Sequence, residues 1–63
     1  MRLRDLREDR DLTQAQIADY LKIKQNTYSQ YENGKREIPL DFLWKLADYY
    51  NVSIDYLVGR TDK

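Results

Sequence analysis

The sequence predicts an all-α fold. The expected fold is a compact domain of five short helices without strands, and it contains a helix-turn-helix. Apolar residues recur at the spacing of helical faces, and no stretch shows the strict alternation of a half-buried strand. Gly34, Pro39 and Gly59 all stand where helices are expected to begin or end. With 63 residues, no Cys and no His, the chain lacks disulfides and zinc, so its 41% hydrophobic residues must be well patterned.

The first helix is expected over about residues 2–10. Leu3 and Leu6 supply its apolar face, with Leu12 following, and Arg, Asp and Glu fill the exposed face. Asp11 is expected to end the helix because Asp tolerates the left-handed conformation that helix ends often need.

A capping box predicts the start of the second helix. Thr13 is expected to be the N-cap, with the Gln16 side chain reaching back to it. The helix runs to Leu21, and its apolar face carries Ile17, Ala18 and Leu21 itself.

Three residues, 22–24, separate that helix from a third one over about residues 25–33. Asn33 and Gly34 predict its end, because Gly adopts positive φ without steric cost. Ile23 is expected to point inward at the corner between the two helices.

Pro39 is expected to open a fourth helix. Its apolar stripe is predicted to be formed by Leu40, Leu43, Ala47 and Tyr50, with Leu46 beside it. A turn is expected at residues 51–52.

Ser53 is expected to cap a short fifth helix that runs to about Val58. Asp55 lies in its first turn, where the helix dipole favours an acidic group, and Gly59 ends it. Residues 1–59 therefore form one expected domain that contains the helix-turn-helix, and residues 60–63 an expected frayed tail.

Charge and hydropathy constrain the class of protein. The formal net charge is zero, with eight basic and six acidic residues in 1–36 against three basic and five acidic in 37–63. This small asymmetry is a hint of polarity that ordinary solvated helix faces explain about as well. No apolar run approaches the roughly 20 residues of a membrane span, and the N-terminus lacks the apolar segment of a signal peptide. We therefore expect a cytoplasmic protein without membrane contact.

An enzyme is poorly supported by the residue types present. The sequence has no His, no Cys, no Gly-rich phosphate loop and no metal-ligand spacing, so catalysis would depend on carboxylates alone. Those carboxylates are mixed with basic residues, as on solvated helix faces. We expect no cofactor, no metal and no small-molecule substrate.

The second and third helices with their short turn form a unit that suits DNA reading, because the second helix of such a pair can enter a major groove. Its outward-facing residues are predicted to be Gln25, Asn26, Ser29 and Gln30. Gln and Asn each offer a donor and an acceptor, which match the edge of adenine. Polar residues occur on any exposed helix, so this pattern alone favours a DNA-reading face and an ordinary solvated surface about equally.

A resemblance that spans nearly the whole chain favours the DNA-reading interpretation. The matching segments are Leu3-Arg4-Asp5-Leu6-Arg7, Leu12-Thr13-Gln14-Ala15-Gln16-Ile17-Ala18, Tyr31-Glu32-Asn33-Gly34-Lys35-Arg36, Ile38-Pro39, Leu46-Ala47 and Val52-Ser53-Ile54-Asp55-Tyr56-Leu57. In order and spacing they resemble the Xre/Cro-type helix-turn-helix family, the lambda-repressor-like DNA-binding domains.

The resemblance implies roles for individual residues. Gln25, Asn26 and Gln30 correspond to the family's usual base readers, and Ser29 is a further candidate. The resemblance also implies contacts to the DNA backbone, from Gln14, Asn33, Lys35 and Arg36. Gln14 agrees with the physics, because a helix N-terminus presents free N–H groups and a positive dipole to an anion.

Arg7 and Glu32 resemble a family pair that braces the first helix against the third. We therefore expect a structural role for Glu32, with a phosphate contact by Arg7 as a lesser alternative.

The turn departs from the family pattern at two positions. Lys22 stands where Gly is common, and holding a non-Gly residue left-handed costs on the order of 1 kcal/mol. Lys24 stands where the next helix usually has a Ser or Thr cap. We hypothesise that both lysines exchange stability for phosphate attraction; the alternative is that both are tolerated surface residues.

The chain is rich in aromatic residues, which could stack on single-stranded bases but are better placed for the core. Tyr31, Tyr50 and Leu57 lie at apolar helical positions, whereas Phe42 and Trp44 do not both fit the stripe of the fourth helix, so at least one is expected to be partly exposed. The resemblance implies a two-fold dimer through the C-terminal helices. The candidate interface residues are Trp44, Ile54, Tyr56 and Val58.

Together these observations predict a small transcriptional regulator that binds double-stranded DNA. The leading expectation is a repressor that binds a palindromic operator as a homodimer, with its two recognition helices about 34 Å apart. The alternative is an antitoxin or another protein whose partner is a second protein, since some relatives use the same fold in that way.

Overall fold

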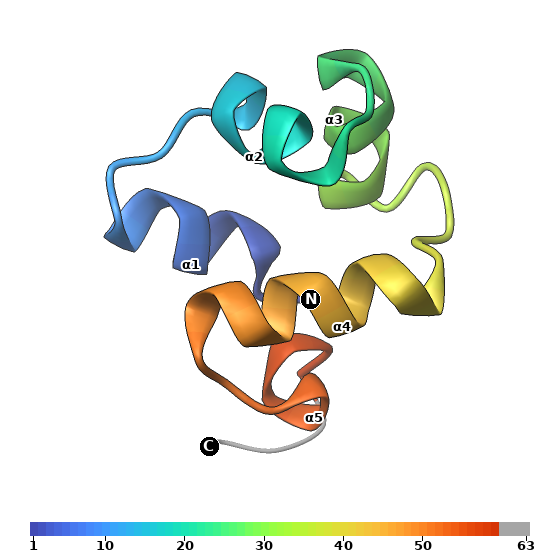
Figure 1. The fold of residues 1–63 in the computed structure, drawn as a ribbon. Coiled ribbons are helices and arrows are strands. Elements are labelled where there is room, and N and C mark those ends of the chain that lie inside the picture. Colours follow the sequence, from blue (N-terminus) through green and yellow to red (C-terminus); the bar gives the residue numbers. More distant parts are fainter. Residues whose placement is uncertain (60–63) are drawn as a thin grey trace.

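The structure is a computed structural model that describes residues 1–59, and within these residues it is all-helical (Figure 1). The helices are α1 (Leu3–Asp9), α2 (Gln14–Leu21), α3 (Gln25–Glu32), α4 (Leu40–Tyr50) and α5 (Ile54–Leu57). The expected five-helix fold is confirmed, while the tail predicted for 60–63 lies outside the described residues. None of the described helices is both long and apolar enough to cross a membrane.

Two groups of helices meet across one core. In Figure 1, α2 and α3 lie together at the top, α1 and α4 lie beneath them, and α5 packs under α4. The first and last helices are joined directly, because the Arg2 backbone N–H donates to the Leu57 carbonyl at 2.8 Å and the Arg2 Nε–H donates to the Tyr56 carbonyl at 3.0 Å. These two hydrogen bonds fix the N-terminal end of α1 against α5.

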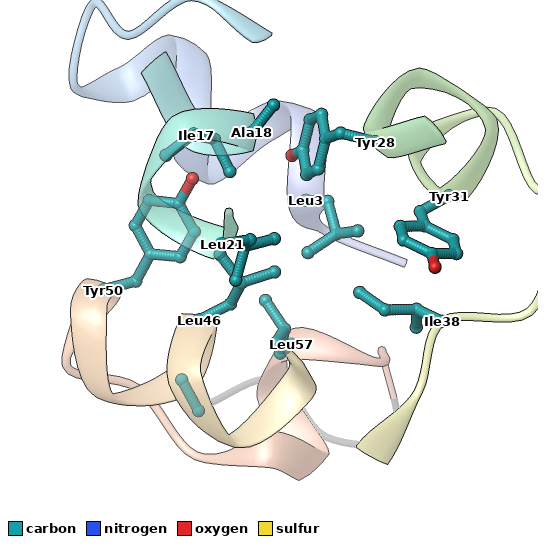
Figure 2. Packing of buried hydrophobic residues seen from close by; sticks show 11 residues of the cluster. Leu3, Ile17, Ala18, Leu21, Tyr28, Tyr31, Ile38, Leu46, Tyr50 and Leu57 are labelled. Atoms are coloured by element: carbon teal, nitrogen blue, oxygen red, sulfur yellow. The ribbon is translucent and has the colours of Figure 1, made fainter. Parts of the chain in front are cut away.

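The core is made of apolar and tyrosine side chains from all five helices and from Ile38 in the loop before α4 (Figure 2). The buried set is Leu3, Ile17, Ala18, Leu21, Tyr28, Tyr31, Ile38, Leu46, Ala47, Tyr50 and Leu57. In a domain this small, removing such surface from water is the main stabilising contribution. The predicted burial of Tyr31, Tyr50 and Leu57 is confirmed.

Four of the helices end in the same way. A left-handed residue follows each helix, at Asp11 (φ 55), Lys22 (φ 61), Gly34 (φ 74) and Asn51 (φ 57). The next residue's N–H then donates back to the last turn, as from Leu12 to the Arg7 carbonyl at 3.1 Å. This is the Schellman motif, in which the residue after the left-handed position also makes an apolar contact. The left-handed conformations predicted for Asp11, Lys22 and Gly34 are thus confirmed.

The next residue is apolar at three of these four ends. Leu12, Ile23 and Val52 each pack against the core from the turn that they occupy. The turns are therefore anchored by hydrophobic contacts, which explains why only one of the four needs a glycine. The inward position predicted for Ile23 is confirmed.

The predicted helix starts are also observed. The Thr13 side chain accepts from the Gln16 N–H at 3.1 Å, and the Gln16 Oε1 accepts from the Thr13 N–H at 2.8 Å, which completes the capping box. Ser53 caps α5 by accepting from the Tyr56 N–H at 3.0 Å. Lys24, the N-cap of α3, makes no side-chain cap hydrogen bond.

The apolar stripe predicted for α4 is wrong at its first residue. Leu40 is 60% exposed, whereas Leu46, placed beside the stripe, is fully buried. At 3.6 residues per turn, the buried face centres between Leu43 and Tyr50, and Leu40 lies roughly 70° around the helix from that centre. The expected first helix was one residue too long at each end, and the expected third and fifth helices were each one residue too long at the C-terminal end, a normal uncertainty at frayed ends.

Candidate nucleic-acid interface

The face that α3 presents to solvent is determined by the tyrosines on its other side. Tyr28 is fully buried and Tyr31 is 8% exposed, so both point into the core (Figure 2). Helical geometry then directs Gln25, Asn26 and the residues one turn later away from it. Gln25 and Asn26 are exposed, and Ser29 and Gln30 are half-buried.

This outward face is uncharged and rich in amides. The structure brings the four predicted base readers together on a single helix of eight residues. Since each of these side chains both donates and accepts hydrogen bonds, the face can read base edges without a strong attraction of its own to phosphate.

A buried carboxylate fixes how α3 sits on the other helices. Glu32, at the C-terminal end of α3, has a fully buried side chain. The Arg7 Nε–H donates to its Oε2 at 2.9 Å and the Arg7 Nη2–H to its Oε1 at 3.0 Å, so the pair is bidentate. The Gln14 Nε2–H donates to Oε1 at 3.2 Å. One carboxylate therefore ties α1, α2 and α3 together, as expected for Glu32.

The surroundings of Glu32 determine its protonation state in the folded protein. Burial by itself raises the pKa of the Glu32 carboxyl, but the hydrogen bonds from Arg7 and Gln14, with the nearby Tyr28 hydroxyl, outweigh burial and lower the pKa to about 2. The hydrogen bond to Glu32 in turn raises the pKa of Arg7. Burial, with the nearby Glu32 charge, raises the pKa of Tyr28. The site thus contains an ionised Glu32, a charged Arg7 and a neutral Tyr28.

The Arg7 guanidinium is engaged in hydrogen bonds within the protein. Besides Glu32, its Nη1–H donates to the Leu12 carbonyl at 2.8 Å, and its side chain is only 12% exposed. The alternative in which Arg7 also contacts phosphate stays a prediction, and it would require new geometry at this guanidinium.

Gln14 is divided between two tasks. One Nε2–H group binds Glu32, which leaves a second N–H on the same nitrogen. The capping box satisfies the Gln16 N–H, so the backbone N–H groups of Gln14 and Ala15 remain the ones that α2 cannot satisfy internally. These groups are arranged as an anion site would require, and the phosphate contact of Gln14 stays a prediction.

The other backbone-contact candidates lie on either side of α3. Lys24 precedes it, and Asn33, Lys35 and Arg36 follow it; all four are exposed. The amide face is thus flanked by lysine and arginine side chains, although the chain as a whole has no net charge.

Arg4 is a residue of this surface that the sequence reasoning missed. Its Nη2–H donates to Asn33 Oδ1 at 3.0 Å, and its Nε–H lies 3.4 Å from Glu32 Oε1. The available signal was its spacing, since Arg4 and Arg7 are three residues apart and share a face of α1.

The predicted dimer residues fall into two neighbouring regions. Trp44, which is 61% exposed, and Ile54 line one shallow depression of about 320 Å³ together with Val52. Tyr56 lines a different depression, and the Arg2 guanidinium lies over its ring at 4.6 Å. Val58 is half-buried at the end of α5.

The expected exposure of one fourth-helix aromatic residue is confirmed. Trp44 is the exposed one, while Phe42 is half-buried with its ring 6.1 Å from that of Tyr31.

Comparison with known proteins agrees with this arrangement. A family described as helix-turn-helix matches residues 3–57. The chain is 44% identical over 61 residues to the uncharacterized HTH-type transcriptional regulator YobD of Bacillus subtilis (strain 168). The match covers 97% of this chain and 54% of that protein. It is 41% identical over 61 residues to the HTH-type transcriptional regulator ImmR of the same organism (97% and 48%). It is 39% identical over 61 residues to the cryptic phage CTXphi transcriptional repressor RstR of Vibrio cholerae (97% and 55%).

The chain spans about half the length of the curated relatives it matches. No solved structure matches it significantly. The family match nevertheless extends from the start of α1 to the end of α5 and includes the Glu32 contacts and the amide face. The chain therefore belongs to the Xre/Cro-type helix-turn-helix family, the lambda-repressor-like DNA-binding domains.

Proposed function

We propose that the protein is a sequence-specific transcriptional regulator, of the repressor kind, that binds a palindromic site in double-stranded DNA as a homodimer. The observation that carries this proposal is the state of α3, whose outward face is uncharged and rich in amides while its inward face and its end are immobilised. Tyr28 and Tyr31 hold the helix to the core, and Glu32 ties it to α1 and α2. A rigid reading helix loses little conformational freedom on binding.

Base reading is assigned to Gln25, Asn26, Ser29 and Gln30. Asn and Gln can donate to N7 and accept from N6 of adenine with one amide group, so adenine-containing steps are the first expected targets. Each well-formed bidentate contact contributes about 1–3 kcal/mol of discrimination against the wrong base. Specificity in this proposal rests on hydrogen bonds and not on net charge.

Affinity is assigned to the flanking groups. Gln14 with the N-terminus of α2 holds one stretch of backbone, and Lys24, Asn33, Lys35 and Arg36 hold others. Contacts of this kind set register and orientation and carry little sequence information. Since they release counterions, binding should weaken steeply as salt rises.

The relatives support the regulatory role. Two of those reported above carry names of transcriptional regulators, and the third is named a phage transcriptional repressor. The names describe proteins about twice as long as this chain. What those longer proteins do is therefore carried over to this chain only as a proposal.

A homodimer is proposed because a palindrome requires two copies of α3 about 34 Å apart. The exposed Trp44 of α4 and the half-buried Ile54 of α5 line one depression and provide an apolar surface for self-association. Tyr56 and Val58 complete the proposed interface from α5.

The experiment that tests the proposal is selection of bound duplexes from a random pool at two salt concentrations. A clear two-fold symmetric consensus, with weaker binding at the higher salt, is the expected result. Weak binding without sequence preference that disappears with salt contradicts the proposal. That outcome would favour the alternative function, an antitoxin or other protein that acts through a protein partner.

A further inference from the structure

Arg4 and two residues of the recognition surface form a row of hydrogen-bonded side chains. The Arg4 Nη2–H donates to Asn33 Oδ1 at 3.0 Å. The Asn33 Nδ2–H then donates to Ser29 Oγ at 3.3 Å. The row begins on α1 and ends at a proposed base reader on α3. We refer to it as the Arg4–Asn33–Ser29 row.

The chemistry of Arg4 sets the direction of every hydrogen bond in the row. A guanidinium has five donors and no acceptor, so the Asn33 atom that faces it must be the carbonyl oxygen. The oxygen and nitrogen of an amide are otherwise interchangeable in shape, and their assignment depends on such neighbours. With Oδ1 turned to Arg4, the amide nitrogen faces Ser29.

Ser29 is consequently an acceptor toward Asn33. A hydroxyl has one proton to donate, and this orientation leaves that proton available. Among the hydrogen bonds of residues 1–59, none uses the Ser29 hydroxyl as the donor. The proton can therefore be directed outward from α3.

We propose that Arg4 is a positioning residue that makes Ser29 a hydrogen-bond donor toward DNA. Ser29 then selects acceptor groups in the major groove, which are N7 of either purine, O6 of guanine and O4 of thymine. The inference rests on the proposed function, because it requires α3 to enter the groove. It assigns part of the sequence specificity to a residue of α1 that itself contacts no base.

Without Arg4, both amide orientations of Asn33 become available. In the reversed one, Asn33 Oδ1 accepts the Ser29 proton, and the Ser29 oxygen offers lone pairs to the amino groups of adenine or cytosine. Selectivity at the base pairs that face Ser29 should therefore relax, while other base pairs keep their preference.

The contribution of Arg4 to the Glu32 contacts is smaller. The distance from Arg4 Nε to Glu32 Oε1 is 3.4 Å and the Arg4 side chain is 55% exposed, whereas Arg7 binds the same carboxylate at 2.9 Å and is 12% exposed. Replacing Arg4 should leave α3 in place, which thermal unfolding of the variant checks.

The test is a double-mutant cycle on a selected duplex and on its single-base-pair variants. Arg4→Met should reduce discrimination at the base pairs that face Ser29 by about five-fold, the equivalent of one hydrogen bond of about 1 kcal/mol. In a Ser29→Ala background, Arg4→Met should change that discrimination no further. Arg4→Lys keeps a charged group that can only donate, and it should preserve the preference.

Two patterns of loss in the variants would overturn the inference. One is a loss that is uniform over all sequences with a shallower salt dependence, which identifies Arg4 as a phosphate contact. The other is equal relaxation in the Ser29→Ala background. A wild-type protein without base preference would instead remove the proposed function together with this inference. A selective wild type whose preference survives Arg4→Met would remove the inference alone.

Discussion

Lys22 shows most directly how single residues set the properties of the DNA-reading unit. It occupies the left-handed position after α2 with φ 61, where the chain has no glycine. Its N–H still donates to the last turn, and Ile23 still anchors the turn to the core. The turn is therefore formed correctly, and the conformational strain is confined to one lysine.

Replacing Lys22 with Gly should stabilise the free protein by about 1 kcal/mol, because Gly adopts the left-handed conformation without a Cβ clash. Urea unfolding measures the change. The matched control is Lys22→Ala, which removes the charge but keeps the Cβ and should not gain stability. An equal gain in both variants would trace the effect to the lysine charge.

The ionised state of Glu32 gives a pH prediction. Its pKa is lowered to about 2 from an ordinary value of 4.5, so its ion pair stabilises the fold fully above about pH 4.5. The contribution, on the order of 2 kcal/mol, should be lost as pH falls from 4.5 toward 2. Unfolding free energies measured between pH 7 and pH 2 test this expectation.

Glu32→Gln should be less stable at pH 7 and should lose much of the pH dependence in that window. The control is Glu37→Gln, which removes an exposed carboxylate and should retain the dependence. If the two variants follow the same curve, Glu32 is not the group responsible.

At the scale of elements, helix starts and ends were the most predictable feature. The capping box of α2, the Ser53 cap and the Asp11 and Gly34 stops all follow from local rules. The Leu40 prediction failed because the apolar stripe alone does not show which part of it faces the core. That choice depends on what packs against α4, which is tertiary information.

For the site, sequence reasoning identified the outward residues of α3 and the Arg7–Glu32 pair, since both depend on helical spacing and the family pattern. It missed Arg4 and the second contact of Gln14. Both involve atoms from helices that are distant in sequence, such as Arg4 Nη2 and Asn33 Oδ1 across 29 positions. Hydrogen bonds of that kind leave no periodic signal.

The missing cap of α3 gives a prediction at this scale. Lys24 makes no cap hydrogen bond and places a positive charge at the positive end of the helix dipole. Lys24→Ser should raise the melting temperature of the free protein, since a Ser cap contributes about 0.5–2 kcal/mol. If Lys24 contacts phosphate, the same change should weaken DNA binding. A simultaneous rise in stability and DNA affinity would contradict the hypothesis that Lys24 lowers the stability of the free protein and strengthens DNA binding.

At the scale of the whole molecule, the proposed base-reading face and the proposed self-association surface lie on different helices of the described chain. The amide face lies on α3, and the exposed Trp44 lies on α4, where it lines a depression together with Ile54 of α5. The core between them fixes their relative geometry. A dimer through the second surface would thus set the spacing between two copies of the first.

Trp44→Lys should weaken self-association by about ten-fold or more, because large aromatic residues dominate such interfaces. Sedimentation equilibrium measures the dissociation constant. Leu40→Lys, at a residue of nearly equal exposure that does not line the Trp44 depression, is the matched control and should have a smaller effect. Unchanged association of Trp44→Lys would place the interface elsewhere.

The central claim, that α3 reads bases while its flanks hold the backbone, is tested most directly by comparing Gln30→Ala with Lys35→Ala. Each variant is titrated with a selected duplex and with all of its single-base-pair variants at two salt concentrations. Gln30→Ala is expected to cost about 1–3 kcal/mol, concentrated at particular base pairs. Lys35→Ala should weaken binding about equally on every duplex and reduce the salt slope by about 1. A Gln30→Ala loss spread evenly over all duplexes would contradict the account.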